Sequence, residues 1–174
     1  MAAPEAIPAL EPKLEHTISL FVNNKPGVLV RVALVFARRG YNIESLVVSP
    51  AANGDFSRMT ITCSGDPNTL GQIIRQLQKL VDVVRAIDHS SDESYGTEIA
   101  LVKVACALDQ RTEILQVAEH FHAKVVDYGP HSLMLRIYGS SEKLDAFIGL
   151  LRPYGLRELV RSGKILMARG VQET

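Results

Sequence analysis

The sequence predicts an α+β protein built from two ferredoxin-like βαββαβ domains in tandem. Segments with the two-residue alternation of strands are interleaved with segments of helical periodicity, in the order strand, helix, strand, strand, helix, strand. This order occurs in residues 16–90 and returns in 98–174, on either side of a polar linker at 91–97. The stretch that begins at Ser57 (SRMTITCSGD…LGQIIRQL) also resembles, in its periodicity, the stretch that begins at Ser132 (SLMLRIYGSS…LDAFIGLL).

The first domain begins with an alternating run of strand formers at 16–22 and a turn signal at Asn23–Gly27. A helix is expected at 28–39, because its apolar residues fall on one stripe and Gly40 is a suitable C-terminal stop. The remaining elements are expected as a strand at 42–49, a strand at 56–63, a helix that opens at Asp66 and Pro67, and a strand at 81–88.

The second domain repeats these elements after the linker. They are expected as a strand at 98–107, a helix at 112–121, strands at 124–128 and 133–138, a helix at 142–151 and a final strand at 156–160. Each domain would place two helices on one sheet face, so the other face and the edge strands need cover or pairing. The apolar residues of strand 42–49 point to both faces, which favours self-association by sheet extension or stacking.

Composition excludes several classes of protein. The 19 Lys and Arg balance the 19 Asp and Glu, whereas nucleic-acid binders carry a basic excess, and aromatic residues for base stacking make up only 6% of the chain. No apolar run is long enough to span a membrane, and residues 1–15 read as a disordered lead-in without the pattern of a signal peptide. We expect a cytoplasmic protein that binds neither nucleic acid nor membranes.

The chain carries no recognisable catalytic or metal-binding motif. Cys63 and Cys106 each sit in an apolar run and are expected as buried thiols. His120 and His122 would point about 200° apart on a helix, so we interpret them as polar residues at a helix end. An enzyme that uses His120 or Asp127 in a cleft stays open as an alternative, and turnover of pyruvate by the chain alone would support it.

The segment from Asn24 to Val28 is the most informative local feature. Pro26 and Gly27 are sufficient for a tight turn between strand and helix. A glycine at a helix start also leaves backbone N–H groups open to an anion, and the helix dipole favours a carboxylate there. Asn24 and Asn42 carry amides that suit the carboxylate and ammonium of a free amino acid, although Asn42 alternatively closes the turn after Gly40.

Longer stretches carry a resemblance to a known family. HTISLFVNNKPGVLVRVALVFARRGYNIESLVV, SRMTI and QLQKLVDVVR, followed by EIALVKV, KVVDYGP, SEKLDAFIGLLRPYG and LVRSGKILMARG, resemble the regulatory small subunit of acetohydroxyacid synthase, also called acetolactate synthase. The resemblance covers about residues 16–171. It identifies the first domain as similar to an ACT domain, a sensor of small molecules.

The resemblance implies a role in regulation and no catalytic activity. In that family the small subunit activates a catalytic large subunit and mediates feedback inhibition by valine, and the catalytic subunit alone holds thiamine diphosphate, magnesium and FAD. No cofactor is therefore expected here. The effector site implied lies between two ACT domains of a homodimer; it comprises the loop residues Asn24, Lys25, Pro26, Gly27, Val28 and Leu29 with Asn42 and Ile43 of the neighbour.

Lys25 and Pro26 depart from the Glu-Ser that many bacterial members carry before the glycine, so valine, leucine and isoleucine all stay open as effector. The second domain has Ala107–Gln110 in place of this loop, which predicts one effector site per chain and a role in assembly and contact with the catalytic subunit. Arg157, Arg161, Lys164 and Arg169 are candidates for that contact. The alternative function is an ACT-type amino-acid sensor that serves a different enzyme or regulator.

Overall fold

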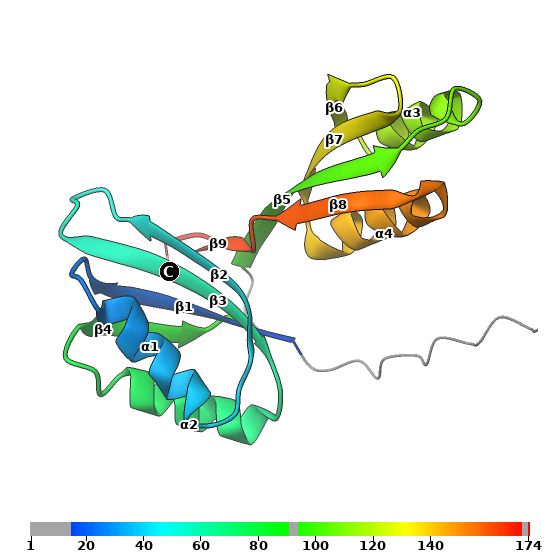
Figure 1. The fold of residues 1–174 in the computed structure, drawn as a ribbon. Helices are drawn as coiled ribbons and strands as arrows, with labels where there is room; N and C mark the ends of the chain where they lie inside the picture. The colour runs from blue at the N-terminus through cyan, green and yellow to red at the C-terminus, as the bar shows by residue number, and fades with distance from the viewer. Residues whose placement is uncertain (1–14, 91–93, 172–173) are drawn as a thin grey trace, which may run out of the picture.

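The computed structural model describes residues 15–90, 94–171 and 174, which form two α+β domains (Figure 1). The disordered lead-in expected at 1–15, apart from Glu15, and the first three residues of the expected linker lie outside the described residues. In the part of the chain that is described, no helix is both long and apolar enough to cross a membrane.

The N-terminal domain is an antiparallel sheet with two helices on one face. Its elements are β1 (Glu15–Asn23), α1 (Val28–Ala37), β2 (Ile43–Pro50), β3 (Phe56–Ser64), α2 (Pro67–Leu77) and β4 (Val83–Asp88), and the strands lie in the order β2-β3-β1-β4. Alternate residues of the two central strands point at the helices. Ile18 and Ile61, which face each other across the β1–β3 ladder, are fully buried there.

The C-terminal domain repeats this arrangement. Its elements are β5 (Ser94–Ala105), α3 (Arg111–His120), β6 (Lys124–Tyr128), β7 (Ser132–Gly139), α4 (Ser141–Leu151), the 3₁₀ turn η1 (Arg152–Tyr154), β8 (Leu156–Arg161) and β9 (Ile165–Ala168). The strand order is β6-β7-β5-β8, and β9 pairs with the first part of β5. The fold class predicted from the sequence, two ferredoxin-like βαββαβ units in tandem, is confirmed.

Helix α2 begins where the sequence places it. The Asp66 side chain accepts a hydrogen bond from the Thr69 N–H at 2.9 Å, and Pro67 occupies the first helical position. This satisfies one of the N–H groups that a helix start leaves open. Ser140 caps α4 in the same way, because its hydroxyl accepts a hydrogen bond from the Lys143 N–H at 3.3 Å.

Two strand assignments at the junction of the domains differ from the sequence expectation. Residues 94–97, expected in the linker, already belong to β5, and β9 follows the strand expected to be the last. In the observed ladder Ser94 pairs with Ala168 and Thr97 with Ile165. Residues 94–97 (SYGT) lack the apolar alternation that predicts a strand, and the apolar β9 (ILMA) is only four residues long, so the sequence did not predict the ladder that the two segments form.

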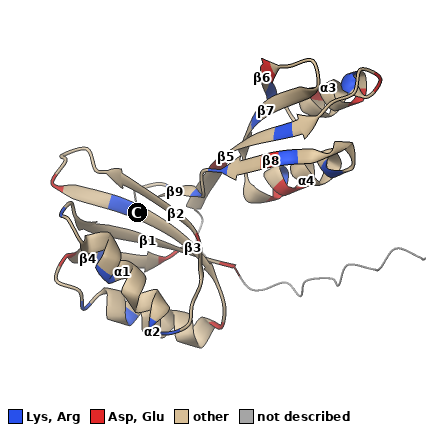
Figure 2. Cartoon of the chain, in the orientation of Figure 1, with Lys and Arg blue, Asp and Glu red and all other residues tan. Residues whose placement is uncertain are grey.

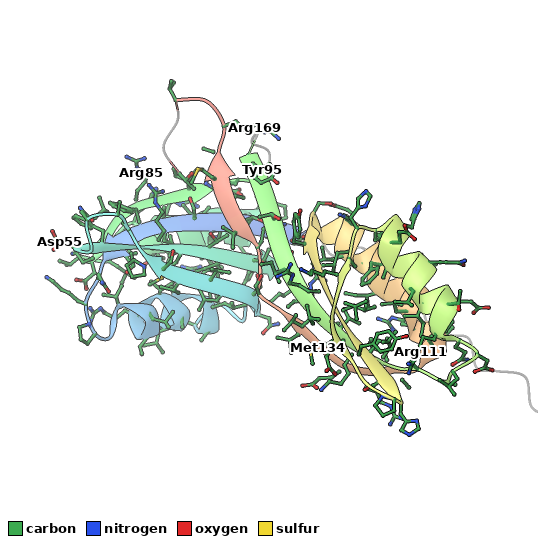
Figure 3. All side chains as sticks on the ribbon, turned by 90° about the horizontal axis from the view of Figure 1, so that it is seen from above. Asp55, Arg85, Tyr95, Arg111, Met134 and Arg169 are labelled. Carbon is green, nitrogen blue, oxygen red and sulfur yellow. The ribbon has the colours of Figure 1, made fainter. Side chains whose placement is uncertain are left out.

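The β5–β9 ladder lies over the face of the N-terminal sheet that the helices leave open (Figures 1 and 3). This face carries a row of buried hydroxyl side chains, contributed by Thr17, Ser19, Thr60 and Thr62. We call Ser162–Ala168 the C-terminal strap. Its Gly163 lies so close to β2 that a Cβ at this position would come within 3.1 Å of Ser45 Cβ.

Polar contacts also fasten the strap and the two domains together. Lys164 Nζ lies 2.9 Å from Glu15 Oε1 and donates to Thr17 Oγ1 at 3.4 Å. Inside the C-terminal domain the buried Glu98 binds Arg161 through Nε at 2.9 Å and Nη2 at 2.6 Å. Because the strap begins one residue after Arg161, this two-bond pair fixes the point where the strap leaves β8.

Candidate effector site

The loop between β1 and α1 is held in place by its neighbours. The Asn24 N–H donates to the Asp55 carbonyl at 2.8 Å, and Asn24 Nδ2 donates to the Gly54 carbonyl at 3.0 Å. The Asn23 N–H donates to the Asp82 carbonyl, also at 2.8 Å. The loop therefore rests on the β2–β3 hairpin, whose tip carries the labelled Asp55 in Figure 3, and on the start of β4.

Gly27 begins α1 in a left-handed conformation, with φ of +82°. This conformation costs an L-residue with a Cβ about 1–2 kcal/mol, which explains why a glycine occupies this position. The first hydrogen bond inside the helix runs from the Arg31 N–H to the Gly27 carbonyl at 3.1 Å. The N–H groups of Leu29 and Val30 therefore stay available to an anion, as the helix-start argument requires.

Arg31 adds a positive charge beside this helix start, and sequence reasoning did not include it in the site. A Cβ on Gly27 would lie 3.5 Å from Arg31 Nη1, and Arg31 Nη2 pairs with Asp82 Oδ2 at 2.5 Å. No acidic side chain occupies the first turn of α1. The four-residue spacing from Gly27 is the sequence signal that would have found Arg31, since residues i and i+4 share a helix face.

The candidate residues do not all present their side chains to the loop. Asn24, Lys25, Pro26, Gly27 and Leu29 are exposed, whereas Val28 is 3% exposed and packs into the core of the domain. An apolar ligand at the loop would therefore meet the side chain of Leu29, and Val28 supports the loop from beneath.

Asn42 and Ile43 lie at the other end of the domain. The end of β1 pairs with Phe56, at the first residue of β3, while Ile43 pairs with Cys63, close to the last. Seven residues of strand separate these positions by about 23 Å. One chain does not bring the two halves of the predicted site together, so the site that the sequence predicts needs a second copy of the chain.

An apolar surface is available for such pairing. Leu29, Val30 and Leu34 are 41%, 61% and 46% exposed along α1, and Val48 on the neighbouring β2 is 43% exposed. We call these four residues the α1–β2 stripe. Among the described residues β2 pairs only with β3, so its outer edge offers backbone groups for pairing alongside the stripe.

The start of α3, the equivalent position in the second domain, is built differently. Its N-cap residue Gln110 has φ of −87° and makes no capping hydrogen bond through its side chain. Arg111 Nη2 donates to the carbonyls of Gly129 and Pro130, both at 2.9 Å, and its guanidinium stacks on Tyr128. The left-handed glycine of the first domain has no counterpart here.

The described ranges contain no cluster of three or more His, Cys, Asp or Glu that could hold a metal ion. Burial raises the pKa of the Cys63 thiol to about 11, so the reactive thiolate is scarce at neutral pH. His120 is the last residue of α3, and His122 adopts a positive φ of 56° just beyond it.

Comparisons with known proteins agree with this architecture domain by domain. Residues 18–85 match the family described as the AHAS small subunit-like ACT domain, and residues 97–170 match the family described as the small subunit of acetolactate synthase. The probable acetolactate synthase small subunit of Archaeoglobus fulgidus is 42% identical over 157 residues, covering 90% of this chain and 98% of that protein. The acetolactate synthase small subunit of Mycolicibacterium smegmatis is 43% identical, covering 89% and 91%.

The solved structures include a match of the same breadth. The crystal structure of the acetolactate synthase small subunit from Thermotoga maritima superposes with a TM-score of 0.79 at 37% identity, covering 90% of this chain and 98% of that one. Sequence and fold thus agree across both domains. The chain belongs to the family of acetolactate synthase small subunits.

Proposed function

We propose that the chain is the regulatory subunit of an acetolactate synthase, that it activates the catalytic subunit, and that it mediates feedback inhibition by valine. The observation that carries the effector part is the open start of α1, where a left-handed glycine and Arg31 flank unsatisfied N–H groups. This combination suits the carboxylate of a free amino acid.

In the proposed complex the valine carboxylate accepts hydrogen bonds from the N–H groups of Leu29 and Val30, and Arg31 adds its charge. The Asn24 amide uses its Nδ2 to hold the loop on Gly54 and offers its carbonyl oxygen to the ammonium group. The isopropyl group packs between Leu29 and Ile43 of the partner subunit. A short side chain fits a site of this kind because it is closed by two protein surfaces.

A homodimer formed through the α1–β2 stripe supplies that second surface. Pairing of two β2 edges would satisfy backbone groups that are otherwise exposed, and it would bury the apolar residues of two α1 helices together. Valine bound across the interface would favour one packing of the dimer. If this preference is transmitted to the catalytic subunit, the coupling free energy between valine binding and catalytic activity would be about 1–3 kcal/mol.

We assign thiamine diphosphate, magnesium and FAD to the catalytic subunit alone. The chain has no glycine-rich loop of the kind that holds a diphosphate, and the role left to it is regulatory. The partners of the chain are then a catalytic large subunit, a second copy of itself and a branched-chain amino acid.

Acetolactate formation by the cognate catalytic subunit tests the proposal, measured with and without this chain across a valine titration. We expect the chain to raise the rate and to make it sensitive to valine. A chain that binds valine but changes neither the rate nor the inhibition would instead serve another enzyme or regulator. Parallel titrations with leucine and isoleucine identify the preferred effector.

A further inference from the structure

A groove runs between α1 and α2 on the helical face of the N-terminal domain. It consists of two hollows of about 580 and 450 Å³ that share Arg39 and Gln76. Four cationic side chains line it, together with amides, and no carboxylate does: Arg38, Arg39, Arg75 and Lys79, with Gln72 and Gln76. We call it the α1–α2 groove, and Figure 2 shows the basic segments on both helices in blue.

No described residue neutralises the positive charge of the groove with an ion pair. Arg39 donates to the amide oxygen of Gln72 at 2.5 Å, and Arg38, Arg75 and Lys79 form no ion pair with any described residue. By contrast, Lys103 and Arg161 in the second domain each bind a carboxylate within 2.7 Å. Neither α1 nor α2 contains an acidic residue, although the whole chain has a formal net charge of zero.

Helix dipoles account for part of this arrangement only. A cation near a helix C-terminus is stabilised by about 0.3–1 kcal/mol, which suits Arg38 after α1 and Arg75 in the last turn of α2. The dipole does not explain why the cations of α1 and those of α2 converge on one groove, where like charges repel each other. Convergent, unpaired cations are typical of a surface that meets an anionic partner.

The groove lies mostly on a different side of α1 from the surface proposed for dimerisation. Val35 lines the groove, and Arg31 binds Asp82 beyond the end of α2, so this side of α1 faces α2. At 100° per residue, Leu29 and Val30 lie about 120–140° around the helix from Val35. Leu34, by contrast, lies about 40° from Arg38, so the end of the stripe borders the groove. A dimer formed through the α1–β2 stripe therefore leaves open the wall of the groove that α2 contributes.

We propose that the α1–α2 groove binds an acidic segment of the catalytic subunit, an inference that rests on the proposed function. Gln72, Arg75 and Gln76 of α2 and Lys79 just after it have the spacing i, i+3, i+4 and i+7, a row of about 10 Å that fits an extended peptide better than a single phosphate. The glutamine amides both donate and accept hydrogen bonds, as a peptide backbone requires. No aromatic side chain lines the groove for the stacking that single-stranded nucleic acid prefers.

This contact is additional to any made by the C-terminal domain, and it has a distinct electrostatic signature. Exposed charges of opposite sign accelerate association, and salt screens them over about 8–10 Å. The chain as a whole has no net charge to produce this effect, so the unpaired cations of the groove should contribute to the salt dependence of subunit association.

The test is a charge reversal, Arg38→Glu with Arg75→Glu, in the full-length chain assayed with its catalytic subunit. The readout is the concentration of chain that gives half-maximal activation of acetolactate formation. We expect the reversal to raise it about tenfold or more, and the milder pair Arg75→Gln with Lys79→Gln to raise it about threefold. Raising the ionic strength from roughly 0.05 to 0.3 M should weaken the wild type more than either variant.

The control reverses an exposed cation of the same domain that lies outside the groove, Arg85→Glu on β4. It should change half-maximal activation by less than about twofold. Calorimetry of valine on each variant alone checks that folding and the effector site are intact.

The outcomes separate the inference from the function on which it rests. A wild-type chain without any activating effect would refute the proposed function. If the wild type activates the catalytic subunit and the groove reversal activates it at the same concentration, the groove inference is overturned and the function stands. The same holds if the control raises the half-maximal concentration as much as the groove reversal does.

Discussion

At Gly27 a single residue decides the geometry of the candidate effector site. Its left-handed φ, which the sequence predicted from a glycine between a strand and a helix, aims the first turn of α1 at solvent. The cap at Asp66 was predicted equally well, because both signals are local in the chain. Arg31 was not included in the predicted site although its spacing from Gly27 is a local signal, whereas its contact with Asp82, 51 residues further along the chain, could not be predicted from the sequence.

Gly27→Asp tests the anion site at this scale, with Gly27→Asn as its matched control. The two side chains have nearly the same shape and only the aspartate carries a charge, while asparagine is among the residues that tolerate a positive φ. We expect the aspartate variant to raise the valine concentration for half-inhibition at least about tenfold and the asparagine variant to raise it less. Both should still activate the catalytic subunit. Full valine sensitivity in the aspartate variant would show that the carboxylate binds elsewhere.

The elements of the fold were predictable wherever one face of a segment is buried. Helices and strands with an apolar stripe, such as α2 and β3, appear within two or three residues of their expected bounds. The first part of β5 was missed because it lacks the apolar alternation of a strand, and β9 was missed because a run of four apolar residues does not by itself distinguish a strand from other structure. The apolar residues on both faces of β2 indicated that both faces make contacts. Val47 lies under the strap, and Val48 belongs to the α1–β2 stripe.

Helix α1 should carry the dimer contact, and Val30→Glu tests this at the scale of the element. Val30 is 61% exposed, so the charge does not disturb the core of the domain but would be buried without a partner in the proposed interface. We expect the dimer dissociation constant, measured by sedimentation, to rise more than about tenfold.

Val81→Glu is the control for the α1 contact, because Val81 is 96% exposed in the same domain and lies outside the α1–β2 stripe. It should leave the dimer unchanged. Equal effects of the two substitutions, or none from Val30→Glu, would rule out the α1–β2 stripe as the dimer contact.

In the whole molecule β5 is the strand that the two domains share. Its first residues lie with β9 over the N-terminal sheet, and its later residues form the centre of the C-terminal sheet, as Figure 3 shows from above. The labelled Tyr95 and Arg169 lie at the far end of this ladder, with the guanidinium 5.8 Å from the ring centroid. A change in the packing of the N-terminal domain would reach the C-terminal domain through β5 and the strap.

Lys164→Met tests this link, because it removes the contacts with Glu15 and Thr17 and keeps a side chain of similar length. Both partners of the ion pair are partly exposed, so we expect at most about 1 kcal/mol of stability to be lost. Amide hydrogen exchange should nevertheless rise in β9 and in the first part of β5.

Lys103→Met provides the control for the domain link, because the ion pair of Lys103 with Glu158 lies within the C-terminal sheet. It should not change exchange in the strap. A Lys164→Met chain with wild-type exchange in β9 would show that the strap is held without this contact.

The central claim is that the effector site combines the loop of one protomer with the strand start of another. Mixing two defective chains, Gly27→Asp and Asn42→Asp, tests it directly. Each variant alone has every site damaged, whereas a mixed dimer contains one site with both mutations and one site with neither. Calorimetry of valine on purified mixed dimers should therefore recover one binding site per dimer with close to wild-type affinity. Mixed dimers that bind no valine, although each parent chain still dimerises, would contradict the account.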